Sequence, residues 1–122
     1  MLKSLALPVW IWIALVGTPF AISIGQVLFK ISSRSLTSMD AENLFKLALN
    51  PVFIAALVLY GGVTVVWVFV LRMVPLSIAY TFMALTFCIV PILSVWLLGE
   101  TIGIRFIIGG TFILAGLLII NV

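Results

Sequence analysis

Charged residues divide this chain into four long uncharged stretches, and that spacing constrains its fold more than any other feature. The stretches run from Ser4 to Phe29, Leu47 to Leu71, Met73 to Gly99 and Phe106 to Val122, and contain 26, 25, 27 and 17 residues. About 20 apolar residues, each rising 1.5 Å along a helix, cross the ~30 Å hydrocarbon core of a bilayer. The spacing therefore predicts four transmembrane helices.

The composition excludes a soluble domain. Hydrophobic residues make up 66% of the chain, charged residues 7%, and the mean hydropathy is +1.49. Backbone groups in lipid must be satisfied internally, and the apolar stretches lack the alternation of barrel strands, so helices are favoured. We expect an all-α membrane protein with a single domain over 1–122 and no soluble catalytic domain. The first stretch lacks a small-residue cleavage site and is expected to be a retained span.

Prolines and capping residues place the ends of the helices. Pro8 suits a first helical turn, Pro75 marks a tight turn, and Pro19 and Pro91 are expected to bend their helices. A capping pattern that ends at Asp40 predicts a short amphipathic helix in the first loop, lying at the membrane interface. The expected spans cover residues 9–32, 50–72, 76–98 and 103–121, and the interfacial helix covers 41–49.

The predicted spans contain no acidic residue. A small proton-driven carrier keeps a carboxylate in mid-membrane, so this chain is expected to work without a carboxylate proton switch. The single Cys88 excludes an internal disulfide, and the lack of histidine removes the commonest metal ligand, so we expect no metal and no cofactor. The net charge of +3 suits anionic lipid headgroups and gives no indication of nucleic acid.

The loops carry an uneven distribution of cations. Lys30, Arg34, Lys46 and Arg105 are expected on one side, with two further cations on the other. This split favours the first side as cytoplasmic, while dual insertion or a partner-imposed orientation remains open.

A polar stripe runs along the first span. Pro19, Ser23, Gln26 and Lys30 are spaced by four, three and four residues, so they share one face of a helix. A glutamine in an apolar span needs hydrogen-bond partners, and the whole stripe predicts a cavity with a cation at its mouth. The alternative is that Gln26 bonds a neighbouring helix and Lys30 extends to the interface.

Cations and a tyrosine extend this candidate site. Lys30, Arg34 and Arg105 lie on one side of a four-span bundle and together suit a phosphate group. Ordinary headgroup anchoring is the alternative, and we favour it for Arg34 and Lys46. Tyr80, near the start of the third span, either lies in an interfacial aromatic belt or donates its hydroxyl to a ligand in the cavity.

Glycines mark one face of the last span. Gly109 and Gly116 are seven residues apart, which suits close helix pairing with another chain. Packing inside the monomer is the alternative. Because four helices enclose little volume, we expect a dimer.

Several segments resemble a known family. The first is Gly25-Gln26-Val27-Leu28-Phe29-Lys30, the second is Val74-Pro75-Leu76-Ser77-Ile78-Ala79-Tyr80, and Gly99-Glu100 and the glycines of the last span follow. Together they resemble the drug/metabolite transporter superfamily, in its four-helix small multidrug resistance or EamA-like form. The Gly-Gln-x-x-x-Lys pattern is most similar to subunits of the aminoarabinose-phosphoundecaprenol flippase.

Two positions depart from the small multidrug exporters. Where these exporters have their binding glutamate, this chain has Ile22, and where they have a tryptophan, it has Met83. The resemblance therefore implies the four-helix fold and a homodimer or heterodimer with a second four-helix subunit, but not proton-coupled drug export.

The resemblance implies a transporter subunit, not an enzyme, that flips a polyprenyl-phosphate-linked sugar across the bacterial inner membrane. Lys30, aided by Arg105, is expected to hold the phosphate, while Ser23, Gln26 and Tyr80 hydrogen-bond the sugar. One alternative is an exporter that lacks the usual glutamate. The other is a non-transporting accessory subunit of a membrane glycosyltransferase system.

Overall fold

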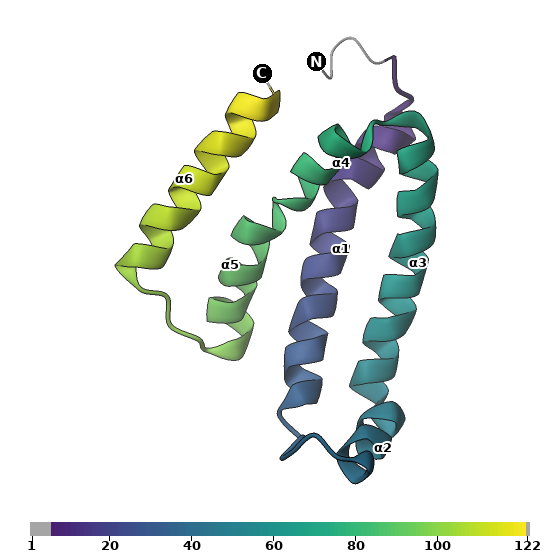
Figure 1. Cartoon of the computed structure of the whole chain (residues 1–122), viewed down its shortest axis with the longest axis vertical. Coiled ribbons are helices and arrows are strands. Elements are labelled where there is room, and N and C mark those ends of the chain that lie inside the picture. Colours follow the sequence, from purple (N-terminus) through teal and green to yellow (C-terminus); the bar gives the residue numbers. More distant parts are fainter. Residues whose placement is uncertain (1–5, 122) are drawn as a thin grey trace.

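The protein is built from helices, the longest two of which lie side by side (Figure 1). The computed structural model describes residues 6–121, and no strand occurs among them. Lys3, one of the two cations expected on the other side of the membrane, lies outside this range. The helices are α1 (Val9–Ser33), α2 (Ala41–Leu49), α3 (Pro51–Met73), α4 (Leu76–Met83), α5 (Thr86–Leu98) and α6 (Ile104–Asn121). The predicted all-α class is confirmed.

Three helical segments are long and apolar enough to cross a membrane. They are α1, α3 and the stretch Leu76–Leu98, which comprises α4 and α5. The apolar part of α6 is shorter and covers Ile104–Ile120. The observed bounds differ from the predicted ones by one residue at most, except within the third span.

The third span is broken into two helices. The break falls at Ala84 and Leu85, and Pro91 lies inside α5 without ending it. The backbone tightens at the break, where the N–H of Leu85 donates to the carbonyl of Phe82 at 3.0 Å. Such three-residue hydrogen bonds are typical of a 3₁₀ turn, which often marks a hinge within a helix. The observed break therefore lies six or seven residues before Pro91.

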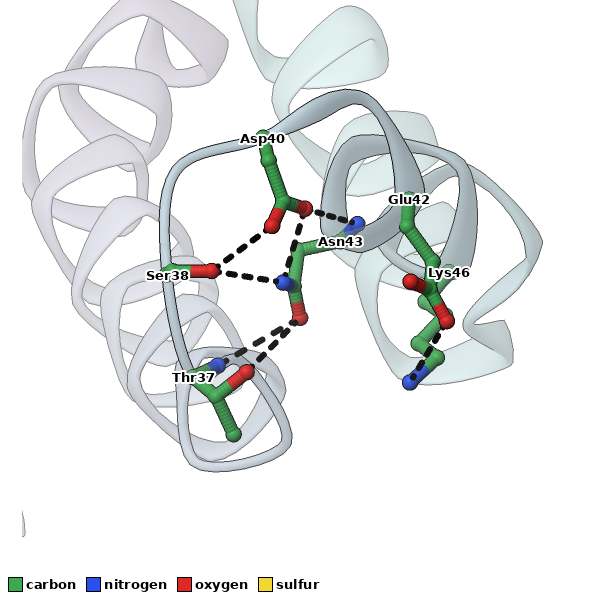
Figure 2. Close-up of polar contacts among 6 residues, drawn as sticks. All are labelled: Thr37, Ser38, Asp40, Glu42, Asn43 and Lys46. Carbon is green, nitrogen blue, oxygen red and sulfur yellow. Dashed lines mark hydrogen bonds and ion pairs between the residues drawn. The ribbon is translucent and has the colours of Figure 1, made fainter.

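The connection between α1 and α2 is closed by a polar network (Figure 2). Asp40 caps α2 as predicted, because its carboxylate accepts the backbone N–H of Asn43 at 2.9 Å. The buried Asn43 side chain donates to Ser38 and Asp40, at 3.2 and 2.9 Å, and accepts from the Thr37 backbone at 3.3 Å. These bonds hold the loop against the start of α2.

The two faces of α2 have different surroundings. Asn43 is buried against the loop that precedes α2, whereas Leu44, Phe45 and Leu49 are exposed. Glu42 and Lys46 form an exposed ion pair at 3.8 Å (Figure 2). The sequence correctly predicted an amphipathic helix here, and its location at the membrane interface stays a prediction.

The helices α1 and α3 form the central pair and lie side by side (Figure 1). Pro51 occupies the first turn of α3, where its missing N–H is harmless, and the Asn50 side chain accepts the N–H of Val52 at 2.9 Å. Near the α3–α4 turn, buried side chains of α1, α3 and α4 make an apolar core. Its members are Ile11, Leu15, Val70, Val74, Ile78 and Ala79.

The opposite end of α5 is fixed to α1. Gly99 closes α5 with a left-handed φ of 68°, a conformation that favours glycine, and the N–H of Glu100 returns to the carbonyl of Ser94 at 3.1 Å. The Arg34 guanidinium donates to the carbonyl of Leu98 at 3.3 Å. A cation at a helix C-terminus also complements the helix dipole. The ends of α1 and α5 therefore meet at one end of the protein.

A pH titration tests the capping network. The pKa of the Asp40 carboxyl lies below its ordinary value of 3.8, first because of the backbone N–H of Asn43 and then because of the Ser38 hydroxyl. A lowered pKa in the folded state means that this cap stabilises the loop above the unfolded pKa and is lost as the pH falls through the folded value. We expect the Asn43 amide NMR shift to titrate with a midpoint below 3.8.

The control is Asp40→Asn, which keeps a capping oxygen but has no carboxyl to titrate. In this variant the Asn43 shift should stay constant over the same pH range. A wild-type midpoint at or above 3.8 would contradict the network.

Candidate functional site

Tyr60 of α3 packs directly on the face of α1 that contains Gly25. A Cβ atom built on Gly25 would overlap the Tyr60 ring and lie 2.7 Å from its Cδ2 atom, so glycine is required by this close approach. The Phe29 ring, one turn along α1, lies 5.0 Å from the Tyr60 ring centroid. The aromatic ring is thus held between two helices.

Gln26 meets the same tyrosine through its side chain. Its amide Nε2 donates to the Tyr60 hydroxyl at 2.6 Å, and that hydroxyl lies 3.5 Å from the backbone carbonyl of Ile22. Ile22, Gln26 and Phe29 recur at helical spacing, so the contact follows one face of α1. The glutamine that the sequence singled out is therefore partnered by α3.

A cavity of about 350 Å³ opens beside this pair. Gln26 and Tyr60 line one part of it, Tyr80 and Met83 of α4 line another, and Thr86 of α5 contributes from beyond the helix break. A neighbouring cavity of about 360 Å³ shares Gln26 and reaches Phe106 of α6. Gln26 therefore lies where the two cavities adjoin.

The structure brings together two of the predicted binding residues. Gln26 and Tyr80 line the same cavity. Ser23 is fully buried, and its hydroxyl donates to the carbonyl of Pro19 at 2.6 Å, so it lines neither cavity. Along the polar stripe of α1, Ser23 is therefore buried, whereas Gln26 is accessible from the cavity.

The predicted cations lie outside the cavity. Lys30, in the last turn of α1, and Arg105, in the first turn of α6, are exposed. Neither forms an ion pair or side-chain hydrogen bond with residues 6–121, whereas Arg34 bonds Leu98 and Lys46 pairs with Glu42. Lys30 and Arg105 are therefore the cations at this end that have no protein partner within the described range.

The glycines of α6 face open space. Nothing lies within 4 Å of a Cβ atom built on Gly109 or Gly116. An apolar cleft of about 520 Å³, lined by Pro91, Trp96 and Phe106 among others, separates α5 from α6. Packing within residues 6–121 therefore does not require glycine at either position.

Sequence reasoning missed Tyr60. Its partners come from another helix, and no spacing within one segment of sequence shows such a contact. One signal was present, because a tyrosine hydroxyl in an apolar span needs a hydrogen-bond partner. The part of the chain from 6 to 121 contains no group of three potential metal ligands.

These features describe a helical membrane protein with a cavity lined by apolar and uncharged polar side chains. Comparison with known proteins finds similarity to three proteins, each named as a probable 4-amino-4-deoxy-L-arabinose-phosphoundecaprenol flippase subunit ArnE. The protein of Sodalis glossinidius is 37% identical over 67 residues, which cover 55% of this chain and 60% of that protein. Those of Erwinia tasmaniensis and Enterobacter sp. are 35% and 32% identical over 66 residues, 54% of this chain and 61% and 62% of theirs.

The similarity confirms the resemblance to aminoarabinose-phosphoundecaprenol flippase subunits. The match spans about three fifths of the length of these relatives. No family model matches the chain, and no solved structure matches it. The long apolar helices identify a multi-pass membrane protein, as predicted, and the similarity agrees with the bacterial inner membrane.

Replacing Gly25 by alanine tests the close contact. The added methyl group must displace the Tyr60 ring, and overpacking of this kind costs about 1–3 kcal/mol. We expect Gly25→Ala to lower the thermal unfolding midpoint in detergent. Gly17→Ala on the same helix is the control, because nothing lies within 4 Å of its added Cβ. Equal midpoints for the two variants would argue against the contact.

Proposed function

We propose that this chain is a subunit of a flippase that moves a polyprenyl-phosphate-linked sugar across the bacterial inner membrane. The observation that carries the proposal is the open cavity that joins the exposed side chains of Gln26 and Tyr80 in a largely apolar bundle. Polar side chains at membrane depth are costly unless they serve a pathway or a partner. The similarity to proteins named as flippase subunits supports the substrate class.

In this proposal the chain crosses the membrane four times, with α6 as the fourth span. Its 18 residues extend about 27 Å at 1.5 Å per residue, close to the thickness of the hydrocarbon core. The spans are then α1, α3, α4 with α5, and α6. The α2 helix lies at the interface on the side of Lys30 and Arg105.

In this proposal the cations bind the phosphate of the headgroup, and the cavity binds its sugar. Lys30 and Arg105 hold the phosphate at the interface through charge-assisted hydrogen bonds, because both are exposed and neither has a partner in the described chain. Gln26 and Tyr80 hydrogen-bond the sugar. Ser23, whose hydroxyl already bonds Pro19, supports α1 instead. The prenyl tail stays in the bilayer, since removing it costs about 0.8 kcal/mol per CH₂.

The break between α4 and α5 is the proposed moving element. Met83 and Thr86 lie on either side of the break, and both line the cavity. Rotation there changes the cavity wall without disturbing the pair of α1 and α3. No covalent step is required, so the proposed function is transport rather than catalysis.

A second subunit completes the proposed pathway. One chain leaves both the apolar cleft and the open face of α6 without a partner among residues 6–121. We propose a homodimer, or a heterodimer with another four-helix subunit, that pairs through Gly109 and Gly116. Small residues at such positions let helix backbones approach closely.

The residue that replaces the exporter glutamate lies at the cavity. Ile22 lines both cavities next to Gln26. An isoleucine cannot exchange a proton, so this position gives the proton-coupled exporter no support. The flippase therefore remains the proposed function.

Translocation by reconstituted protein tests the binding residues. With the chain and its suspected partner in liposomes, we expect Gln26→Leu and Lys30→Ala each to slow movement of a lipid-linked sugar about tenfold. A neutral hydrogen bond such as that of Gln26 contributes about 0.5–1.5 kcal/mol, and one to a charged group such as that of Lys30 contributes about 1.5–3 kcal/mol, so losses of roughly tenfold are expected. Lys46→Ala is the matched control, because Lys46 pairs with Glu42 away from the cavity. Unchanged rates in both test variants would remove the proposed site.

Bulky substitutions test the role of the α6 glycines. We expect the double variant Gly109→Leu and Gly116→Leu to reduce association between fluorescently labelled subunits in liposomes, because leucine keeps the helices apart. The control is Gly61→Leu in α3, another glycine beside which nothing lies within 4 Å. Association that resists the double variant would place the interface elsewhere.

A further inference from the structure

The two hydrogen bonds at Tyr60 have a defined direction. A tyrosine hydroxyl has one proton to donate, and its oxygen lies 3.5 Å from the carbonyl oxygen of Ile22, which can only accept. Its oxygen then accepts from Gln26, and only the amide nitrogen Nε2, which lies 2.6 Å away, can donate. Tyr60 therefore binds the nitrogen end of the Gln26 amide.

This direction leaves the amide oxygen of Gln26 available. No residue in the range 6–121 donates a hydrogen bond to Oε1, and the side chain is exposed at the junction of the two cavities. A carbonyl oxygen is only an acceptor. The nearby Thr86 hydroxyl is occupied, because it donates to the carbonyl of Met83 at 2.7 Å.

We propose that Tyr60 is a positioning residue that makes Gln26 present an acceptor, so that the cavity selects headgroups with O–H or N–H donors. This deepens the proposed function by defining the chemistry of the headgroup, and it rests on that function only for the identity of the substrate. No carboxylate lines the cavity. Recognition therefore depends on hydrogen bonding rather than on ion pairing with an acidic group.

The packing around Tyr60 keeps this arrangement in place. Gly25 gives the ring its position against α1, and Phe29 lies beside it at 5.0 Å between ring centroids. If Tyr60 turned away, the Gln26 amide would lose its hydrogen bond to the tyrosine hydroxyl in a largely apolar setting, which is unfavourable. The tyrosine thus acts on a ligand by positioning Gln26.

The sequence offers an unusually direct test. Gln26 is the only glutamine, and the chain has two tyrosines, Tyr60 and Tyr80. Side-chain ¹⁵N-glutamine labelling therefore gives one pair of amide NMR signals. We expect Tyr60→Phe to shift these signals and speed their exchange with water, whereas Tyr80→Phe leaves them unchanged in the ligand-free protein. Equal responses to the two variants, or no response to Tyr60→Phe, would overturn the proposal.

A matched pair of ligands tests the selectivity. Dodecylammonium and dodecyltrimethylammonium have the same charge and tail, but only the first carries N–H donors. Wild-type protein in nanodiscs should bind dodecylammonium about tenfold more tightly, as expected for one charge-assisted hydrogen bond, and its Gln26 signals should shift. Tyr60→Phe should reduce this preference to about twofold.

Equal binding of both ligands by wild-type protein, or an undiminished preference in Tyr60→Phe, would contradict the proposed role. Both arms measure binding and spectra without transport. A failure of lipid-linked sugar translocation would therefore count against the proposed function alone, and a failure here would count against Tyr60 alone.

Discussion

The contact between Tyr60 and Gly25 is the constraint on which the rest of the arrangement depends. Glycine lets the aromatic ring reach the backbone of α1, and the ring then places its hydroxyl within 2.6 Å of the Gln26 amide. Without the close approach, a glutamine in this apolar helix would have no partner from α3. Gln26 and Tyr60 together form one part of the wall of the cavity that extends to Tyr80.

A polar but uncharged cavity has a different use from an acidic one. A buried carboxylate exchanges protons and binds cations, whereas an amide and a phenol bind neutral sugars and donor groups. Lys30 and Arg105, which form no ion pair with residues 6–121, lie outside the cavity at the ends of α1 and α6. This separation suits a substrate with an anionic phosphate next to a hydroxyl-rich headgroup, which is the class proposed here.

The sequence predicted most helices well, because charges, prolines and caps act locally. It placed α2 at 41–49, and the structure gives Ala41–Leu49 with Asp40 as its cap. It did not predict the break at Ala84 and Leu85, where no proline or glycine marks it, and the kink at Pro91 stays a prediction. It found Gln26 from a stripe on one helix and missed Tyr60, because that contact joins two helices.

The most direct test is the reactivity of single cysteines in a Cys88→Ser background toward a charged, membrane-impermeant thiol reagent. Met83→Cys lies at the cavity, and Val65→Cys lies on an exposed apolar part of α3. If the cavity is hydrated and holds the headgroup, Met83→Cys reacts, lipid-linked sugar protects it, and Val65→Cys stays unlabelled. Equal reactivity at the two positions, or labelling of Met83→Cys that added lipid-linked sugar does not change, would contradict the account.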